Sequence, residues 1–188
     1  MGVFNRSVLM KVHAILAVFI LPVAVMFFVT GALYTWGIKG EYDTTVHEIH
    51  LESPIKIQLG ELVNLAEKEL EARNISVPTG QANIKNIGDS FKLEWSGSDM
   101  DVVIESTSQP LIMQLEIKKA SWYRQFVQLH KAKGGDSFKV YATALATFLI
   151  LLLITGFIMA WQMPKLRKLT LLSTVLGMVV FVAMILSN

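Results

Sequence analysis

Histidine is the residue type best suited to chemistry in this chain of 188 residues, which contains four histidines and no cysteine. The lack of cysteine excludes disulfides, thiolate metal sites, iron–sulfur clusters, covalently attached c-type haem and cysteine nucleophiles. A neutral imidazole can ligate b-type haem iron and several divalent metals. The sequence has no glycine-rich dinucleotide fingerprint, P-loop, nucleophile elbow or zincin motif, so it shows no recognisable nicotinamide, flavin or nucleotide site. Any redox activity must use a cofactor held by other side chains, with electrons from a partner or a diffusible reductant.

Two of the histidines belong to a repeated pattern. His13 precedes an apolar stretch that ends in Thr30–Trp36, and His130 precedes one that ends in Thr155–Trp161. Both endings read Thr-Gly-x4-Trp, and a small-residue step of this kind lets helices or a flat ligand approach closely. If the two segments cross a membrane in opposite directions, each histidine lies near the other segment's tryptophan. In the alternative interpretation, the tryptophans mark the membrane interface, Thr-Gly is ordinary helix packing and the histidines point to the headgroups.

The other two histidines lie in His47-Glu48-Ile49-His50. Imidazole and carboxylate groups suit iron, zinc, manganese or nickel. In a helix, His47 and His50 could share one metal, whereas in a strand they would point to opposite faces. We interpret His47, Glu48 and His50 as a candidate site for ferric iron, with an exposed polar stretch as the alternative.

Three long apolar runs must position these residues: residues 14–37, 140–163 and 169–187. About twenty residues suffice to cross the hydrocarbon core. The first run could instead be a signal peptide, but it is too long for that and lacks a clear cleavage site. With 53% apolar and 17% charged residues, the composition also favours a membrane protein.

Positive charges indicate the orientation of the chain. The short segment 164–168 carries three basic residues, and Arg6 and Lys11 precede the first run. Because short basic loops stay cytoplasmic, we expect the N-terminus inside and residues 38–137 outside. The net charge of +2 and the lack of a Lys/Arg-rich block argue against a nucleic-acid partner, so the expected environment is membrane lipid.

The external segment predicts a small α+β unit, since it combines helical and alternating apolar patterns. We expect one helix over a three-stranded meander, with a further edge strand from Ile55 to Leu59. A second helix, in which Trp122, Phe126 and Leu129 share one face, is expected to lie on the outer leaflet. The predicted helix is Glu61–Arg73, and the strands are Phe91–Trp95, Asp101–Glu105 and Leu111–Ile117.

The two histidine segments, flanking an external helix-plus-strands unit, resemble PepSY-associated transmembrane proteins. The resemblance covers nearly the whole chain and is closest to the small three-helix members, the VciB-type inner-membrane proteins of Gram-negative bacteria linked to ferric iron reduction. In the external part, Leu62–Glu67 and Val102–Glu105 indicate a PepSY unit. The fold class is thus an α-helical membrane protein with three transmembrane helices and a PepSY-like α+β extracytoplasmic domain. The expected segments are 1–37 (N-terminus and first helix), 38–119 (periplasmic domain), 120–137 (interfacial helix), 138–163 (second helix), 164–168 (cytoplasmic loop) and 169–188 (third helix).

The resemblance implies an oxidoreductase of the bacterial inner membrane, with b-type haem bound by His13 and His130, that reduces periplasmic ferric iron and supports ferrous uptake. No catalytic residue beyond these ligands is implied, and the electron donor is an unidentified cytoplasmic or membrane partner. A spanning helix separates His13 from His130 by roughly the membrane thickness, so within one chain they cannot share an iron. Either each pairs with another ligand, such as Met163 opposite His13, or a two-fold homodimer brings two copies of His13 together. The alternative functions are a membrane-anchored PepSY-type binding or regulatory module and an accessory subunit of a transporter.

Overall fold

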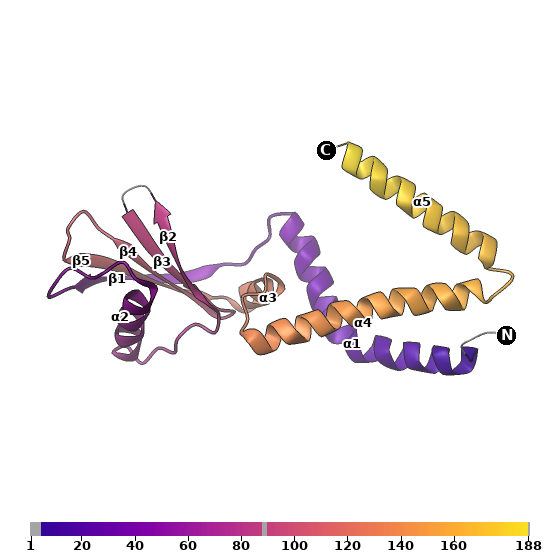
Figure 1. The fold of residues 1–188 in the computed structure, drawn as a ribbon, viewed down its shortest axis with the longest axis horizontal. Coiled ribbons are helices and arrows are strands. Elements are labelled where there is room, and N and C mark those ends of the chain that lie inside the picture. The colour runs from indigo at the N-terminus through magenta and orange to yellow at the C-terminus, as the bar shows by residue number, and fades with distance from the viewer. Residues whose placement is uncertain (1–4, 88–89, 188) are drawn as a thin grey trace. The chain divides into compact units, whose positions relative to one another are not determined.

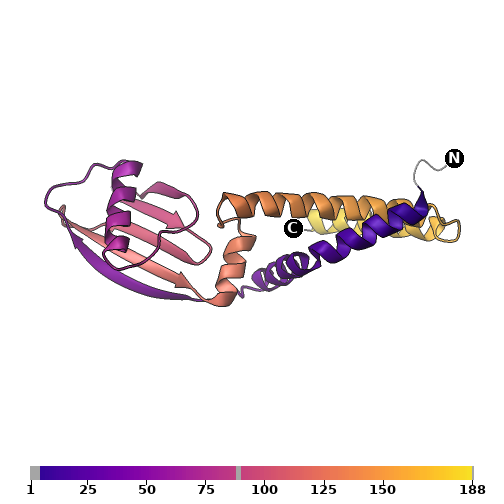
Figure 2. The same ribbon diagram turned by 90° about the horizontal axis from the view of Figure 1, so that it is seen from below.

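The structure is a computed structural model that describes residues 5–87 and 90–187. The first four residues of the expected segment 1–37, and Asn188 at the end of the expected third helix, lie outside the described residues. The chain forms two compact units: one extends to Ala24 and resumes at Thr143, and the other is Val25–Ala142. Figures 1 and 2 show the elements of both units.

Three helices are long and apolar enough to cross a membrane: α1 (Arg6–Thr35), α4 (Asp136–Trp161) and α5 (Arg167–Leu186). They contain 30, 26 and 20 residues, and about 20 residues of helix span the roughly 30 Å hydrocarbon core. Large apolar side chains along all three are exposed, as expected of helices that contact lipid. The prediction of three membrane helices is confirmed.

The second unit contains a five-stranded antiparallel sheet in the order β1-β5-β4-β3-β2. Strands β2 to β5 form a meander, and β1 adds to it beside β5. The three predicted strands are confirmed as β3, β4 and β5, whereas β1 and β2 were not predicted. The edge strand expected from Ile55 to Leu59 is wrong, because this segment leads into helix α2, which begins at Leu59. The strands are β1 (Tyr42–His50), β2 (Ala82–Ile87), β3 (Ser90–Ser96), β4 (Met100–Ser106) and β5 (Ile112–Ala120).

Helix α2 (Leu59–Glu71) lies across one face of the sheet (Figure 2). Its fully buried side chains, Leu62, Ala66 and Leu70, recur at helical spacing, and they pack into one core with side chains from β3, β4 and β5, including Leu93 and Leu115. Burying a leucine of this kind contributes roughly 1.5–3 kcal/mol. This core makes the sheet a stable platform for the rest of the unit.

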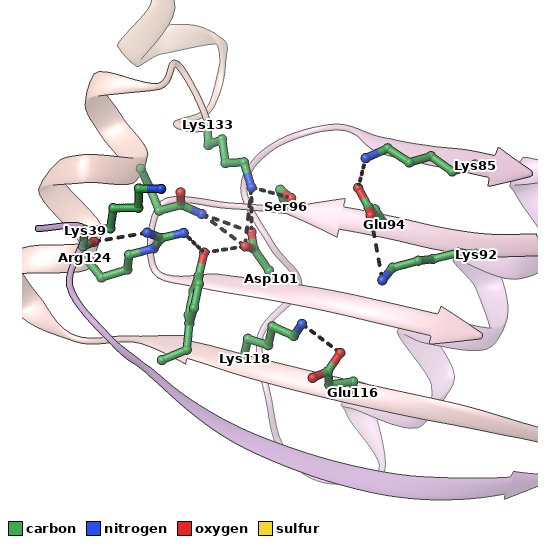
Figure 3. Close-up of polar contacts among 12 residues, drawn as sticks. Lys39, Lys85, Lys92, Glu94, Ser96, Asp101, Glu116, Lys118, Arg124 and Lys133 are labelled. Atoms are coloured by element: carbon green, nitrogen blue, oxygen red, sulfur yellow. Dashed lines mark hydrogen bonds and ion pairs between the residues drawn. The ribbon is translucent and has the colours of Figure 1, made fainter. Parts of the chain in front are cut away.

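The face of the sheet opposite α2 carries charged side chains in pairs (Figure 3). Glu94 lies between Lys85 and Lys92, at 2.5 and 3.9 Å, and Lys92 also pairs with Glu105 at 2.7 Å. The ion pair with Glu105 raises the pKa of Lys92. At one end of this face lies helix α3 (Trp122–His130), whose last residue is one of the candidate histidines.

Candidate functional site

The first candidate histidine meets the Thr-Gly step of the second apolar segment. His13 on α1 lies with Nδ1 2.8 Å from Oγ1 of Thr155 on α4. An added Cβ at Gly156 would lie 3.7 Å from Cε1 of the same imidazole. Both residues of the step therefore contact His13, and all of these residues belong to the first unit.

The second candidate histidine repeats this arrangement in the other unit. His130 ends α3, and its Nδ1 lies 2.9 Å from Oγ1 of Thr30 on α1. An added Cβ at Gly31 would lie 3.1 Å from Cε1 of His130. The ring of Phe27 is 5.0 Å from the imidazole, between centroids, and Phe27 stacks on Phe138 at 6.4 Å. The two halves of the repeated sequence pattern thus form two equivalent contacts.

The hydrogen bonds of the two threonines favour one tautomer of each imidazole. The hydroxyl of Thr30 donates to the carbonyl of Met26 at 2.7 Å, and that of Thr155 donates to the carbonyl of Leu151 at 2.8 Å. When each hydroxyl gives its proton to that carbonyl, Oγ1 accepts from the Nδ1–H of a neutral imidazole. The proton-free nitrogen is therefore Nε2, and within the part of the chain that the structure describes neither Nε2 has a hydrogen-bond partner.

This geometry suits a metal ligand. A ligating histidine ordinarily donates its other N–H to a fixed acceptor, which holds the ring orientation and strengthens the coordinating nitrogen. Thr155 and Thr30 occupy that role for His13 and His130. Each histidine was predicted to lie near the tryptophan of the other segment, and the residues of that segment that the structure places against it are the Thr-Gly step.

The segment with the other two histidines is a strand. His47, Glu48 and His50 lie in β1, where successive side chains alternate between faces. His47 and His50 therefore project to opposite sides. The interpretation in which the segment is a helix and both imidazoles bind one metal is wrong. In the described residues no group of three His, Cys, Asp or Glu could hold a metal ion. Glu48 and His50 share one face, so their contribution to iron binding stays a prediction.

His50 lines a pocket of about 480 Å³ between the end of β1 and helix α2. Three carboxylates, Glu52, Glu61 and Glu69, line the same pocket. Glu69 already pairs with Arg73. The pocket is therefore a polar hollow on the α+β domain.

A polar cluster around Asp101 holds α3 on the sheet (Figure 3). Asp101 is 9% exposed and accepts from the hydroxyl of Tyr42 at 2.5 Å. The fully buried amide of Gln128 donates to both carboxylate oxygens at 3.1 and 3.2 Å, and Nζ of Lys133 lies 3.4 Å away. Removing one partner of such a cluster leaves a buried polar group unsatisfied, at a cost of about 1–3 kcal/mol.

The same cluster connects α3 to the segment that follows α1. Arg124 donates to the hydroxyl of Tyr42 at 3.2 Å and to the carbonyl of Lys39 at 3.1 Å. The hydroxyl of Tyr123 donates to the carbonyl of Ile38 at 3.2 Å. These contacts fix the helix whose last residue is His130. Burial first, and the hydrogen bond to Asp101 second, together raise the pKa of Tyr42 to about 12.

Sequence reasoning gave Thr30 and Thr155 a role in the close approach of helices or a flat ligand, and it missed their hydrogen bonds to the histidines. It also missed Asp101, Tyr42 and Gln128. The signal for the threonines was present, since the two apolar segments repeat the same histidine-to-threonine pattern. Nothing in the local sequence indicated that Asp101, in an alternating strand, would be buried.

Together these elements define a membrane-anchored protein with a small α+β domain and a histidine-threonine pair in each unit. The family model described as PepSY-associated TM region matches residues 3–163. The chain belongs to the PepSY-associated transmembrane family. No curated protein and no solved structure gives a significant match to the chain.

Proposed function

We propose that this chain is a b-type haem oxidoreductase of the bacterial inner membrane that reduces ferric iron on the periplasmic side and so supports ferrous uptake. The observation that carries the proposal is the pair of contacts His13–Thr155 and His130–Thr30. Ferric iron as the substrate rests on the resemblance to VciB-type members of the family.

The donor set fits a b-type haem. His13 and His130 would each supply Nε2 as an axial ligand, while Thr155 and Thr30 hold Nδ1 and so orient the rings. The haem, when bound, supplies one-electron redox chemistry that no side chain of this chain provides. Phe27 packs beside His130 and would exclude water from that ligand.

A second iron ligand beside His13 would have two candidate sources. Met163 lies in the same unit as His13 and carries a thioether that can ligate haem iron. Alternatively, two copies of His13 meet across a two-fold homodimer interface. Co-expression of His13→Ala with the unaltered chain separates the two: isolated mixed dimers with a shared site would have one axial histidine and a shifted Soret band.

The positive-inside rule supports the proposed direction of electron flow. The basic residues around Lys165 and near Arg6 favour a cytoplasmic N-terminus and a periplasmic segment 38–137. Electrons from a cytoplasmic or membrane donor would then pass outward, and the α+β domain would face the ferric substrate.

The test is an absorption spectrum of the purified chain, oxidised and then reduced with dithionite, for the unaltered protein and two matched threonine variants. Thr155→Val and Thr30→Val remove only the acceptor of the Nδ1–H and should weaken haem retention about 10- to 100-fold, the usual effect of losing such a partner. Thr147→Val is the control, because Thr147 also donates to the carbonyl four residues earlier but contacts no histidine in the described chain. A haem spectrum unchanged in both threonine variants would show that the two threonine contacts do not support haem binding, and it would contradict the proposal.

The pocket beside His50 supports a second candidate function, a non-enzymatic binding or regulatory module or an accessory subunit of a transporter. The pocket has a polar lining and a volume of about 480 Å³, and it could accept a short peptide segment of a partner. A purified chain with no Soret band, from cells supplied with haem, would favour this second function.

A further inference from the structure

Four lysines line one pocket at the start of the second membrane helix. The pocket has a volume of about 440 Å³ and lies where the linker between α3 and α4 meets β2 and β3. One carboxylate and several neutral polar groups complete the lining. The cations are Lys85, Lys131, Lys133 and Lys139; the carboxylate is Glu94; the neutral polar side chains are Gln81, Asn83 and Ser96.

The charges in this pocket favour an anion. Glu94 pairs with Lys85 on β2 at 2.5 Å and with Lys92, two residues earlier on β3, at 3.9 Å. Lys133 binds the hydroxyl of Ser96 at 3.0 Å, with Asp101 behind it at 3.4 Å (Figure 3). Lys131 pairs with no carboxylate in the described residues; its ammonium group lies 6.0 Å from the ring of Tyr34. Lys139 pairs at 3.0 Å with Asp136, which does not line the pocket. On the pocket wall the four lysines outnumber the one carboxylate, and Lys131 leaves an unbalanced positive charge.

The pocket is formed by backbone groups as well as by side chains. A Cβ added at Gly80 would clash with the carbonyl oxygen of Ser96 and would lie 3.2 Å from that of Lys133. The indole of Trp95 donates to the carbonyl of Gly80 at 3.0 Å. Ala132 has a φ of 57°, a left-handed conformation that a non-glycine residue adopts only where the surrounding structure imposes it. The linker is thus held against the sheet in one conformation.

The position of the pocket identifies the anion as a lipid headgroup. Lys139 lies in the first turn of α4, and helix α3 beside it exposes Trp122 (74%) and Phe126 (40%). Exposed aromatic side chains of an amphipathic helix next to a membrane span lie at headgroup depth. We infer that the lysine pocket binds the phosphate of an anionic phospholipid, phosphatidylglycerol. Its glycerol hydroxyls match the neutral polar lining, whereas a choline group would be repelled by the lysines.

Native mass spectrometry of the purified full chain tests this inference, with phosphatidylglycerol or phosphatidylcholine added in detergent. We expect one phosphatidylglycerol per chain to be retained and phosphatidylcholine to be lost. The variant Lys131→Gln/Lys139→Gln should weaken phosphatidylglycerol retention tenfold or more, as each lysine near a lipid phosphate contributes roughly a fivefold effect. Lys133 is left unaltered because it also binds Asp101.

The control Lys56→Gln/Lys119→Gln removes the same charge from two exposed lysines of the same unit, and it should retain the lipid. Equal retention of both lipids by the unaltered chain would overturn the inference, as would equal loss of phosphatidylglycerol in both double variants. A third arm adds free glycerol 3-phosphate. Displacement of the lipid by this soluble anion at comparable concentration would show a site for a soluble phosphate and would also overturn the inference.

Discussion

The two glycines of the repeat differ in how closely they meet their histidines, and this difference gives a quantitative prediction. At Gly31 an added Cβ would lie 3.1 Å from Cε1 of His130, and at Gly156 it would lie 3.7 Å from Cε1 of His13. A distance of 3.7 Å is an ordinary carbon–carbon contact. At 3.1 Å the imidazole must move, although its Nδ1 is held by Thr30 at 2.9 Å.

Gly31→Ala should therefore weaken haem binding at His130, and Gly156→Ala should leave binding at His13 nearly unchanged. Overpacking of a fixed contact costs about 1–3 kcal/mol, so the haem dissociation constant at His130 should rise at least about fivefold. In both helices alanine has a higher intrinsic helix propensity than glycine by about 1 kcal/mol. Gly156→Ala should thus keep or raise the melting temperature of the chain.

The assay is titration of the haem-free chain with haem, followed at the Soret band, in each variant with the other histidine replaced by alanine. Pairing Gly31→Ala with His13→Ala isolates the His130 site, and pairing Gly156→Ala with His130→Ala isolates the His13 site. Equal dissociation constants for Gly31→Ala and its glycine parent would refute the reasoning, because the ring would then have moved without loss of its ligand geometry. A larger effect at Gly156 than at Gly31 would contradict the distances themselves.

Three further predictions concern stability, topology and the α+β domain. The tyrosine pKa is near 10 in the unfolded chain and about 12 for Tyr42 in the folded chain, so between these pH values only the folded state retains the phenol proton. The free energy of unfolding should then fall as the pH rises from about 10 to about 12, by at most about 1–2 kcal/mol after solvent screening. Subtracting the pH profile of Tyr42→Phe should isolate this decrease. An identical slope of unfolding free energy against pH in both proteins would contradict it. Alkaline phosphatase fused after Gln114 should be active in a bacterial host and inactive when fused after Lys168, and activity at Lys168 would reverse the orientation. His50→Ala should slow reduction of ferric iron while the haem spectrum stays intact, whereas His47→Ala, on the other face of β1, should not; equal rates for both variants would assign His50 to the solvated surface.

The parts of this fold with a strong periodic pattern were predictable from sequence. The three membrane helices are continuous apolar runs, and helix α2 and strands β3 to β5 have apolar residues at helical or alternating spacing. Strand β1 was missed because it lies at the sheet edge, where Asp43 to Val46 are exposed and no alternation is visible. Because this segment is a strand, His47 and His50 lie on opposite faces of β1. Sequence alone had left both helix and strand open for it.

The candidate site was predictable only in part, for a related reason. The repeat identified His13 and His130, but the partner of each depends on how far the two segments slide past one another. That offset places the threonine against the imidazole. The cluster at Asp101 depends on a helix that follows β5 and folds back onto the open face of the sheet, and no local pattern indicates such a long-range contact.

The central claim is that electrons pass from histidine-bound haem in this chain to ferric iron, and single-turnover reoxidation tests it most directly. The purified chain is reduced with dithionite, freed of excess reductant without air, and mixed with ferric citrate and a ferrous chelator in a stopped-flow spectrometer. The account predicts that the reduced haem band disappears and that one ferrous chelate forms per haem oxidised, with both signals lost in His13→Ala/His130→Ala. A reduced haem band that persists in the presence of ferric citrate, or ferrous chelate formation that is undiminished in the double variant, would contradict it.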